Sequence, residues 1–271
     1  MTDEPLRTDS IHVTVWNDSG PTAPRAVLVH GTMTWGTECF ERQRPLADEF
    51  ALEVVDRRGF GDSPDIERSD WEIDAADVVE LLGEGAHLMG HSYGGVVAMA
   101  AAARRPQAVR SLVLIEPAAY RVAEEVPAVR AGLERNRAAL AEGGAFRKMS
   151  AEDYLRSGAE FGFDVPEFTP RRLRATRTAM AERPAWEAEI PLEPLAAADF
   201  PKVVVIGAWD EANPQYREAA GEALMGSGVF VAEKIGARLV RVPGADHFPH
   251  RDRDELVNAL LRETWRGAAA R

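Results

Sequence analysis

The segment AHLMGHSYGGVVAMA, residues 86–100, carries the most informative pattern in this chain. An apolar run leads into GHSYGG, and strong helix formers follow it. A strand, then Gly-x-Ser-x-Gly, then a helix is the context in which a serine is presented as a nucleophile on a sharp, strained turn. Gly90 and Gly94 are expected where any Cβ would collide with a neighbouring strand or helix. We therefore predict that Ser92 is a nucleophile; an ordinary glycine-rich turn is the alternative.

Short apolar runs, each closed by Gly or Pro, recur along the chain with helix-like segments between them. Their apolar character suits strands that are buried on both faces of a mostly parallel sheet. The predicted strands are residues 11–16, 26–29, 51–55, 86–89, 111–115, 203–206 and 238–242. The fold class is therefore predicted to be α/β, with the first strand or two antiparallel at an edge.

One interval, residues 119–199, breaks this alternation because it contains no convincing buried strand. It consists of alanine-, arginine- and glutamate-rich helical stretches that are interrupted by prolines. A segment this polar buries little surface by itself, so we expect a helical cap that lies over the sheet. The predicted organisation is a core domain of residues 1–118 and 200–271 and a cap subdomain of residues 119–199.

A serine hydroxyl needs a base to take its proton, normally a histidine held by a carboxylate. His247 follows the last predicted strand, at the edge where open α/β sheets assemble their sites, and is the predicted base. His250 is expected at the surface or behind His247. An H-x-x-H metal pair is the alternative for these two residues, but no third ligand follows nearby, so no metal is expected. The other histidines lie in or beside predicted strands and turns, with His91 expected to be packed: His12, His30, His87 and His91.

The acid that orients the histidine should follow the preceding strand. Asp210, in VVVIGAWDEANP, meets that requirement and is the predicted acid, with Glu211 as a solvated neighbour. Glu116, at the end of SLVLIEP, follows the strand after the serine turn and could reach the same histidine. Glu116 therefore stays open as the alternative.

An oxyanion intermediate needs two backbone N–H donors. The residue after the nucleophile, Tyr93, supplies one. The loop in AVLVHGTMTW supplies the other, because Gly31 lets the chain approach the serine and Thr32, or less favourably Met33, then points its N–H inward. The alternative is that this segment is only a strand ending.

The composition limits the classes of partner. The formal net charge of -12 over 271 residues repels nucleic-acid phosphates and anionic membrane surfaces. The single cysteine, Cys39, cannot form an internal disulfide, and residues 1–10 have no apolar core of the kind that a signal peptide needs. No apolar run approaches the roughly 18 residues of a membrane span. We expect a cytoplasmic protein that binds neither nucleic acid nor membrane.

Taken together, the motifs VLVHGT, VVDRRGFGDS, GHSYGG, LVLIEP, VVVIGAWD and VPGADH resemble, in this order, those of the α/β-hydrolase superfamily. The resemblance is to its capped branch of esterases, lactonases and cofactor-free haloperoxidase-like enzymes. It implies a catalytic triad of Ser92, Asp210 and His247 and oxyanion donors at Thr32 and Tyr93. It also implies that the charged residues of VVDRRGFGDS, at positions 56–58, shape a turn beside the site. The sequence contains no phosphate-cradling loop or cofactor fingerprint, so no cofactor is expected.

The expected activity is hydrolysis of a carboxylic ester or lactone of a small molecule through an acyl-enzyme. Acyl transfer, C–C bond hydrolysis, perhydrolysis or a tailoring cyclisation with the same triad is the alternative, and a non-catalytic binding module is a further one. Trp35 and Trp186 are candidates for lining the substrate pocket. The arginines at positions 171, 174 and 177 are interpreted as a solvated helix face, with an anion site as the alternative. Nothing in the sequence indicates the oligomeric state.

Overall fold

A computed structural model describes residues 10–141, 144 and 148–269 of the chain. The expectation that the N-terminal segment is not a signal peptide falls, apart from Ser10, on residues outside this described part.

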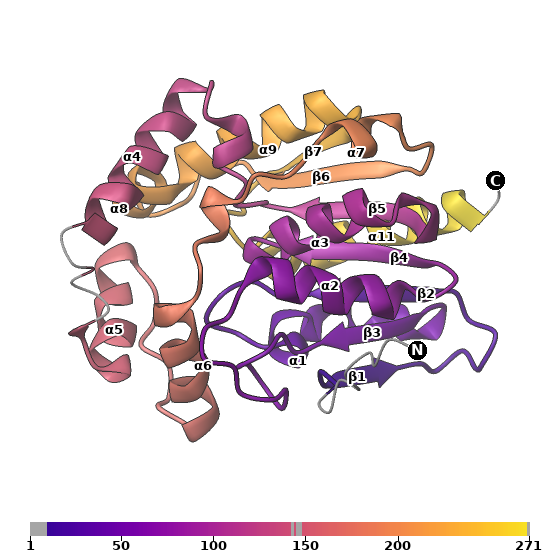
Figure 1. Cartoon of the computed structure of the whole chain (residues 1–271), viewed down its shortest axis with the longest axis horizontal. Helices are drawn as coiled ribbons and strands as arrows, with labels where there is room; N and C mark the ends of the chain where they lie inside the picture. Colours follow the sequence, from indigo (N-terminus) through magenta and orange to yellow (C-terminus); the bar gives the residue numbers. More distant parts are fainter. Residues whose placement is uncertain (1–9, 142–143, 145–147, 270–271) are drawn as a thin grey trace, which may run out of the picture.

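Seven strands form one sheet at the centre of the molecule (Figure 1), in the order β1-β3-β2-β4-β5-β6-β7. The edge strand β1 runs antiparallel to β3, and all the other pairs are parallel. The predicted α/β class and the antiparallel edge are therefore confirmed. The strands are β1 (Val13–Trp16), β2 (Arg25–Val29), β3 (Ala51–Val55), β4 (Ala86–His91), β5 (Val109–Ile115), β6 (Lys202–Gly207) and β7 (Arg238–Val242).

The central strands β4, β5 and β6 are buried along most of their length because helices cover both faces of the sheet. In β5, Leu112 and Leu114 point into one core, whereas Val113 and Ile115 point into the other. This alternation follows from the two-residue period of a strand. The helices on the first face are α2 (Trp71–Leu82), α3 (Tyr93–Arg104) and α9 (Glu222–Ile235). The opposite face is covered by the 3-10 helix η1 (Glu41–Asp48) and by α11 (Asp254–Ala269).

Between β5 and β6 the described residues form helices and turns and no strand. Figure 1 shows α4, α5 and α6 together at one end of the sheet. Thr178 of α6 donates a hydrogen bond to the carbonyl of Gly59 (2.8 Å), which lies in the loop after β3. This segment therefore packs on loops at the carboxyl ends of the parallel strands. Its α-helices are α4 (Pro127–Ala141), α5 (Ala151–Ser157), α6 (Pro170–Ala181) and α7 (Glu193–Ala197).

The remaining α-helices of the described part are short: α1 (Gly36–Cys39) after β2, α8 (Pro214–Tyr216) after β6 and α10 (Pro249–Asp252) after β7. Further 3-10 helices and a π-helix lie between these elements: η2 (Pro106–Ala108), η3 (Arg121–Ala123), η5 (Gly158–Phe161), η6 (Ala185–Glu187) and the π-helix η7 (Arg217–Gly221). None of the helices in the described part combines the length and apolar character that crossing a bilayer would require.

Gly94 provides a test of the packing at the start of α3. A Cβ at this position would lie 2.1 Å from the carbonyl oxygen of Val29, which is immobile backbone. Gly94→Ala is therefore expected to lower the free energy of unfolding by at least about 2 kcal/mol, as measured by urea denaturation. Gly267→Ala is the control, because no atom lies within 4 Å of that Cβ, and it should raise stability by up to about 1 kcal/mol. Equal stability of the two variants would contradict this account of the turn.

Candidate active site

Ser92 lies between the end of β4 and the start of α3, with φ 54° and ψ -115°. A positive φ is uncommon for a non-glycine residue and is a form of local strain. The Ser92 N–H donates to the carbonyl of Ile115 at 2.9 Å, and a Cβ on Gly90 would lie 2.2 Å from the carbonyl oxygen of Gly94. The expected reason for the two glycines of the motif is confirmed, since a side chain at either position would collide with backbone.

His247 lies in the loop that follows β7, and its ring reaches the serine. The His247 Nε2 atom is 3.0 Å from Ser92 Oγ, within hydrogen-bond distance. The His247 side chain is 12% exposed, so the pair is largely shielded from water. A base in this position can take the hydroxyl proton.

Glu116 supplies the carboxylate on the other side of the histidine. Its Oε2 atom lies 3.6 Å from His247 Nδ1, and the glutamate is fully buried. The other oxygen, Oε1, accepts from the Gly207 N–H (2.7 Å) and from Trp209 Nε1 (3.2 Å). Glu116 Oε2 and His247 Nδ1 are both buried and have no other hydrogen-bond partner, so each is the polar group available to the other. Catalytic hydrogen bonds are often long without substrate.

Asp210 is not brought to the histidine. It is exposed, and its Oδ1 accepts from the N–H of Gly244 at 3.0 Å, which secures the loop after β7. No ion pair joins Asp210 and His247, both of which the structure describes. The expected place of Asp210 beside the histidine is therefore corrected to Glu116. The physical reason is that the Asp210 carboxylate is engaged by loop backbone, whereas Glu116 is directed at the ring by two donors.

The two expected oxyanion donors lie on either side of Ser92. Tyr93 is the first residue of α3, where an N–H has no partner within the helix. The loop carrying Thr32 approaches the serine closely, because a Cβ on Gly31 would lie 3.2 Å from Ser92 Cβ. Neither the Thr32 nor the Tyr93 N–H donates to an acceptor in the described part of the chain. Both amides are therefore available to an oxyanion.

Beneath these donors lies a buried ionic cluster that the sequence did not indicate as one unit. The Arg57 guanidinium, 1% exposed, donates to Asp74 (3.0 Å), to Glu182 (3.2 Å) and to the carbonyl of Gly31 (3.0 Å). It also lies 4.0 Å from the centroid of the Tyr93 ring. Arg57 therefore holds the turn beside Ser92, as expected for VVDRRGFGDS, and contacts both the Gly31 carbonyl and the Tyr93 ring.

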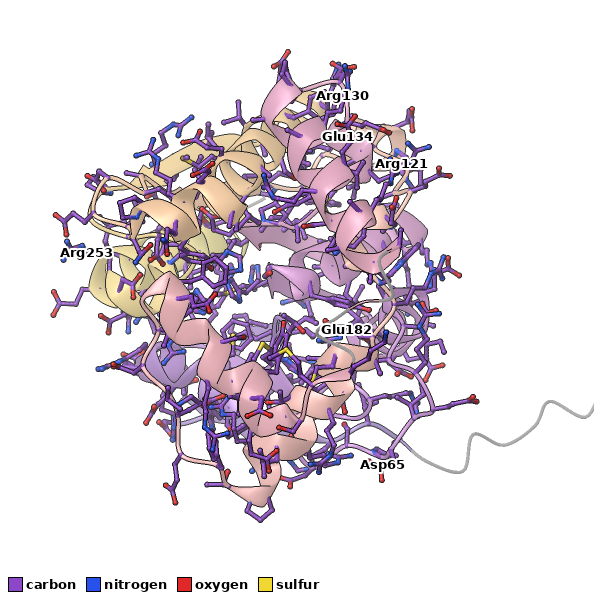
Figure 2. All side chains as sticks on the ribbon, turned by 90° about the vertical axis from the view of Figure 1, so that its left-hand side faces the viewer. Asp65, Arg121, Arg130, Glu134, Glu182 and Arg253 are labelled. Carbon is purple, nitrogen blue, oxygen red and sulfur yellow. The ribbon has the colours of Figure 1, made fainter. Side chains whose placement is uncertain are left out.

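Glu182 is the residue of this cluster that comes from the helical segment. Its carboxylate accepts a hydrogen bond from the Thr32 hydroxyl. In Figure 2, which looks onto the end of the sheet covered by that segment, Glu182 lies near the middle, whereas Asp65 and Arg130 lie near the periphery. The neighbouring Arg183 carbonyl accepts from the Tyr93 hydroxyl at 3.1 Å. No sequence motif distinguishes Glu182 from the other acidic residues of the segment.

The candidate pocket residues are only partly accessible. The guanidinium carbons of Arg171 and Arg172 each lie 4.8 Å from the centroid of the Trp35 ring. Trp186 is partly buried against the core that contains α3, and neither indole stacks on His247. A place for Trp35 and Trp186 in the substrate pocket stays a prediction.

The arginines of α6 are not a solvated face throughout. Arg171 pairs with Asp62 at 3.0 Å and Arg174 with Asp65 at 2.6 Å. These ion pairs fasten α6 to the loop after β3, and they leave little of either guanidinium for an anionic ligand.

His250 is not at the surface, which corrects the first of its two expected positions. It is fully buried and lies 3.6 Å, through Nε2, from Cys39 Sγ. His91 is packed, as expected, and its Nε2 lies 2.9 Å from the His247 carbonyl. The H-x-x-H pair does not form, because His247 faces the serine and His250 faces Cys39.

Comparison with known proteins assigns the chain to a protein family. Residues 26–260 match the profile of the Alpha/beta hydrolase family. Among solved structures, a thermophilic esterase from Thermogutta terrifontis, in its malate-bound form, superposes with a TM-score of 0.64 at 26% identity, covering 95% of this chain and 93% of that one.

Curated relatives include the lipase LipV of Mycobacterium tuberculosis, 36% identical over 40% of this chain. Pimeloyl-[acyl-carrier protein] methyl ester esterases are also similar: that of Aeromonas salmonicida is 35% identical over 34% of this chain, and that of Neisseria meningitidis serogroup A is 30% identical over 92%. The matched segments span 42% of the lipase, 37% of the Aeromonas esterase and 79% of the Neisseria esterase.

The ionic cluster generates a pH prediction. Burial raises the pKa of Glu182 to about 7, although Arg57 and the Thr32 hydroxyl oppose this rise. In the unfolded chain a glutamate titrates near pH 4.3, so the folded state binds this proton more tightly. The stability that the proton contributes is complete below about pH 4 and is lost as the pH rises through about 7.

Between pH 5 and pH 8 the free energy of unfolding of the wild type should therefore fall relative to that of Glu182→Gln, by up to about 3 kcal/mol. Denaturant unfolding at each pH measures the difference. Glu189→Gln is the matched control, because that side chain is 76% exposed and should leave the pH dependence unchanged. The prediction would be contradicted if the free energy of unfolding depended on pH in the same way in the wild type and in the Glu182→Gln variant.

Proposed function

The chain belongs to the Alpha/beta hydrolase family, and on this basis we propose that it is a serine hydrolase that cleaves a carboxylic ester or lactone of a small molecule. The observation that carries the proposal is the 3.0 Å contact between Ser92 Oγ and His247 Nε2, with the buried Glu116 carboxylate behind the ring. Similarity to an esterase, a lipase and methyl ester esterases supports the choice of an ester bond.

In the proposed reaction, Ser92 Oγ attacks the carbonyl carbon while His247 Nε2 takes its proton. Glu116 keeps the proton of the neutral ring on Nδ1 and stabilises the imidazolium that forms. The imidazolium then protonates the leaving alcohol as the tetrahedral intermediate collapses to an acyl-enzyme. Water, deprotonated by the same histidine, releases the acid and regenerates the serine.

Charge on the tetrahedral oxygen is stabilised by the N–H groups of Thr32 and Tyr93 together with the amino end of α3, whose helix dipole is positive there. Arg57 supports both donors from below. The guanidinium holds the carbonyl of Gly31, which precedes Thr32, and lies against the Tyr93 ring. A preorganised donor pair of this kind costs no reorganisation at the moment of reaction.

Residues 119–199 act, in this proposal, as a cap over the site. Support comes from two contacts that join the segment to the oxyanion region: Thr32 with Glu182, and Tyr93 with the carbonyl of Arg183. Ser92 is only 8% exposed, so substrate entry requires space that the segment can provide by moving.

Ser92→Ala tests the nucleophile directly. This variant should lose roughly 10⁴-fold or more in kcat on a chromogenic ester and should not be labelled by a fluorophosphonate. Ser19→Ala, at an exposed turn, is the control and should keep both activity and labelling. Ester hydrolysis that survives in a folded Ser92→Ala variant would overturn the proposed function.

A matched pair of amide substitutions distinguishes the roles of Glu116 and Asp210. Glu116→Gln keeps an oxygen for Gly207 and Trp209 but directs an NH₂ donor at His247 Nδ1, which favours the wrong tautomer. We expect kcat to fall by about 10³ to 10⁴-fold with little change in fold. Asp210→Asn should change kcat by no more than about threefold, because Asp210 contacts only loop backbone. Steady-state kinetics that show the larger loss in Asp210→Asn would return the acid role to that residue.

A further inference from the structure

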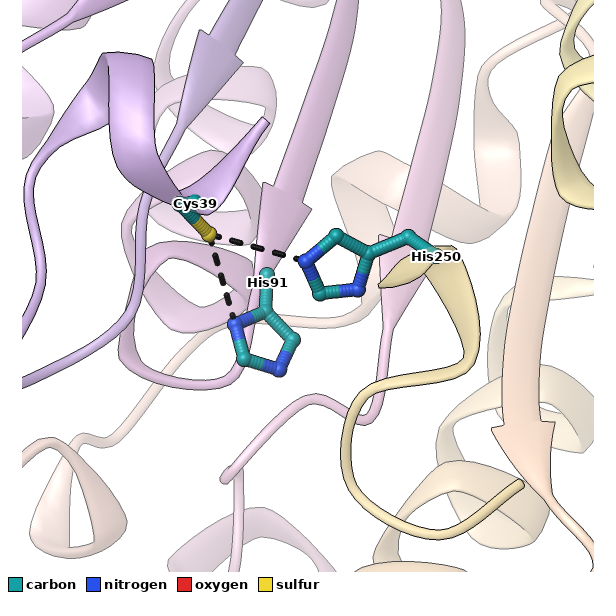
Figure 3. Close-up of side chains that lie close together, drawn as sticks. All are labelled: Cys39, His91 and His250. Carbon is teal, nitrogen blue, oxygen red and sulfur yellow. Dashed lines mark hydrogen bonds between the residues drawn. The ribbon is translucent and has the colours of Figure 1, made fainter. Parts of the chain in front are cut away.

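Cys39, His91 and His250 meet in the core directly behind His247. They come from three different elements: the end of α1, the end of β4 and the short helix α10. Figure 3 shows both imidazole rings turned toward the Cys39 sulfur. The relative exposure is 2% for Cys39, 2% for His91 and 0% for His250. The serine mechanism uses none of the three side chains.

The two distances from the Cys39 sulfur to the imidazole nitrogens match those between ligands of a single ion. Cys39 Sγ lies 3.8 Å from His91 Nδ1 and 3.6 Å from His250 Nε2, and all three atoms lie within 4.8 Å of one another. With metal–sulfur and metal–nitrogen bonds of about 2.3 and 2.0 Å, sulfur and nitrogen ligands of one ion lie about 3.5 to 3.8 Å apart. Little movement of the sulfur relative to either ring would be required.

The hydrogen bond of His91 leaves the correct nitrogen free. A carbonyl oxygen only accepts, so the 2.9 Å contact with the His247 carbonyl requires a proton on His91 Nε2. In a neutral ring Nδ1 is then unprotonated, and its lone pair faces the cysteine. Support of this kind, in which the second nitrogen donates to a carbonyl, is typical of histidines that bind metals.

Charge and ligand type select the ion. A thiolate with two imidazoles is a soft ligand set, which suits Cu(I) and Zn(II). Structural zinc sites have four ligands, whereas the described residues bring three together here. One thiolate and Cu(I) sum to zero charge, whereas one thiolate and Zn(II) leave a net positive charge in a buried site, which is costly. We propose that Cys39, His91 and His250 form a buried trigonal binding site for one Cu(I) ion.

Binding replaces the Cys39 S–H bond by an S–Cu bond and releases the proton to solvent, so no oxidant or reductant takes part. The site adjoins the serine site without sharing a ligand with it. The His91 and His247 ring centroids are 4.8 Å apart. Occupancy would therefore tie α1, β4 and α10 together beneath His247.

Anaerobic titration of the full chain with Cu(I) held by a chromogenic Cu(I) chelator tests the site. Because the ligands are buried, the ion is offered both to the folded protein and during refolding. The wild type should withdraw one equivalent and show a thiolate-to-copper absorption in the near ultraviolet. Cys39→Ser and His250→Ala should weaken binding by at least about 100-fold. His12→Gln, on a histidine outside the trio, should bind as the wild type does.

Copper-edge X-ray absorption identifies the atoms bound to the copper in the wild type. This measurement does not depend on whether the variants fold. A first shell of one sulfur and two nitrogen ligands supports the proposal. No uptake, a shell without sulfur, or full binding by a folded Cys39→Ser variant overturns it and leaves the trio as a hydrogen-bonded core cluster. Uptake of Zn(II) but not Cu(I) overturns the assignment of the ion. Ester hydrolysis is measured separately, so failure of the proposed function would not affect this result.

Discussion

The backbone at Ser92 is the constraint on which the rest of the site depends. Its φ of 54° costs of order 1 to 3 kcal/mol and persists only because the surroundings leave no alternative. Val29 backbone closes over Gly94, and Gly94 backbone closes over Gly90, so the strand, the turn and the helix are locked together. This packing raises the serine hydroxyl above the sheet and aims the first N–H groups of α3 at the same space.

A buried guanidinium connects the parts of the molecule that meet at this turn. Arg57 follows β3, yet it contacts the loop after β2, a carboxylate of α2 and a carboxylate of the helical segment. Burial raises the pKa of Asp74 to about 6 and that of Glu182 to about 7, and Arg57, the cation that both carboxylates share, opposes both rises. Breaking a buried pair of this kind leaves an uncompensated charge, so separating the helical segment from Arg57 carries a free-energy cost.

The choice between Glu116 and Asp210 shows what a strand pattern can and cannot decide. Both carboxylates follow neighbouring parallel strands, β5 and β6, so both end at the edge where His247 lies. Chain order favours Asp210, but the local sequence does not show which carboxylate reaches the histidine. The ranking depends on which N–H donors each carboxylate meets. The Gly207 backbone N–H and the Trp209 indole N–H direct Glu116 at the ring, while the Gly244 backbone N–H binds Asp210 elsewhere.

The sequence by itself determined the α/β class, the seven strands to within a few residues, the antiparallel edge and the serine turn, because strand burial, helix propensity and the glycine requirement are local properties. It also indicated the loops that carry Thr32 and His247, since parallel strands deliver their ends to one edge. Only the tertiary structure decided which carboxylate faces His247, how Glu182 meets Arg57, and that Cys39 lies against two histidines. Those contacts join residues up to 211 positions apart, and their distances depend on how whole elements pack, which no local pattern encodes.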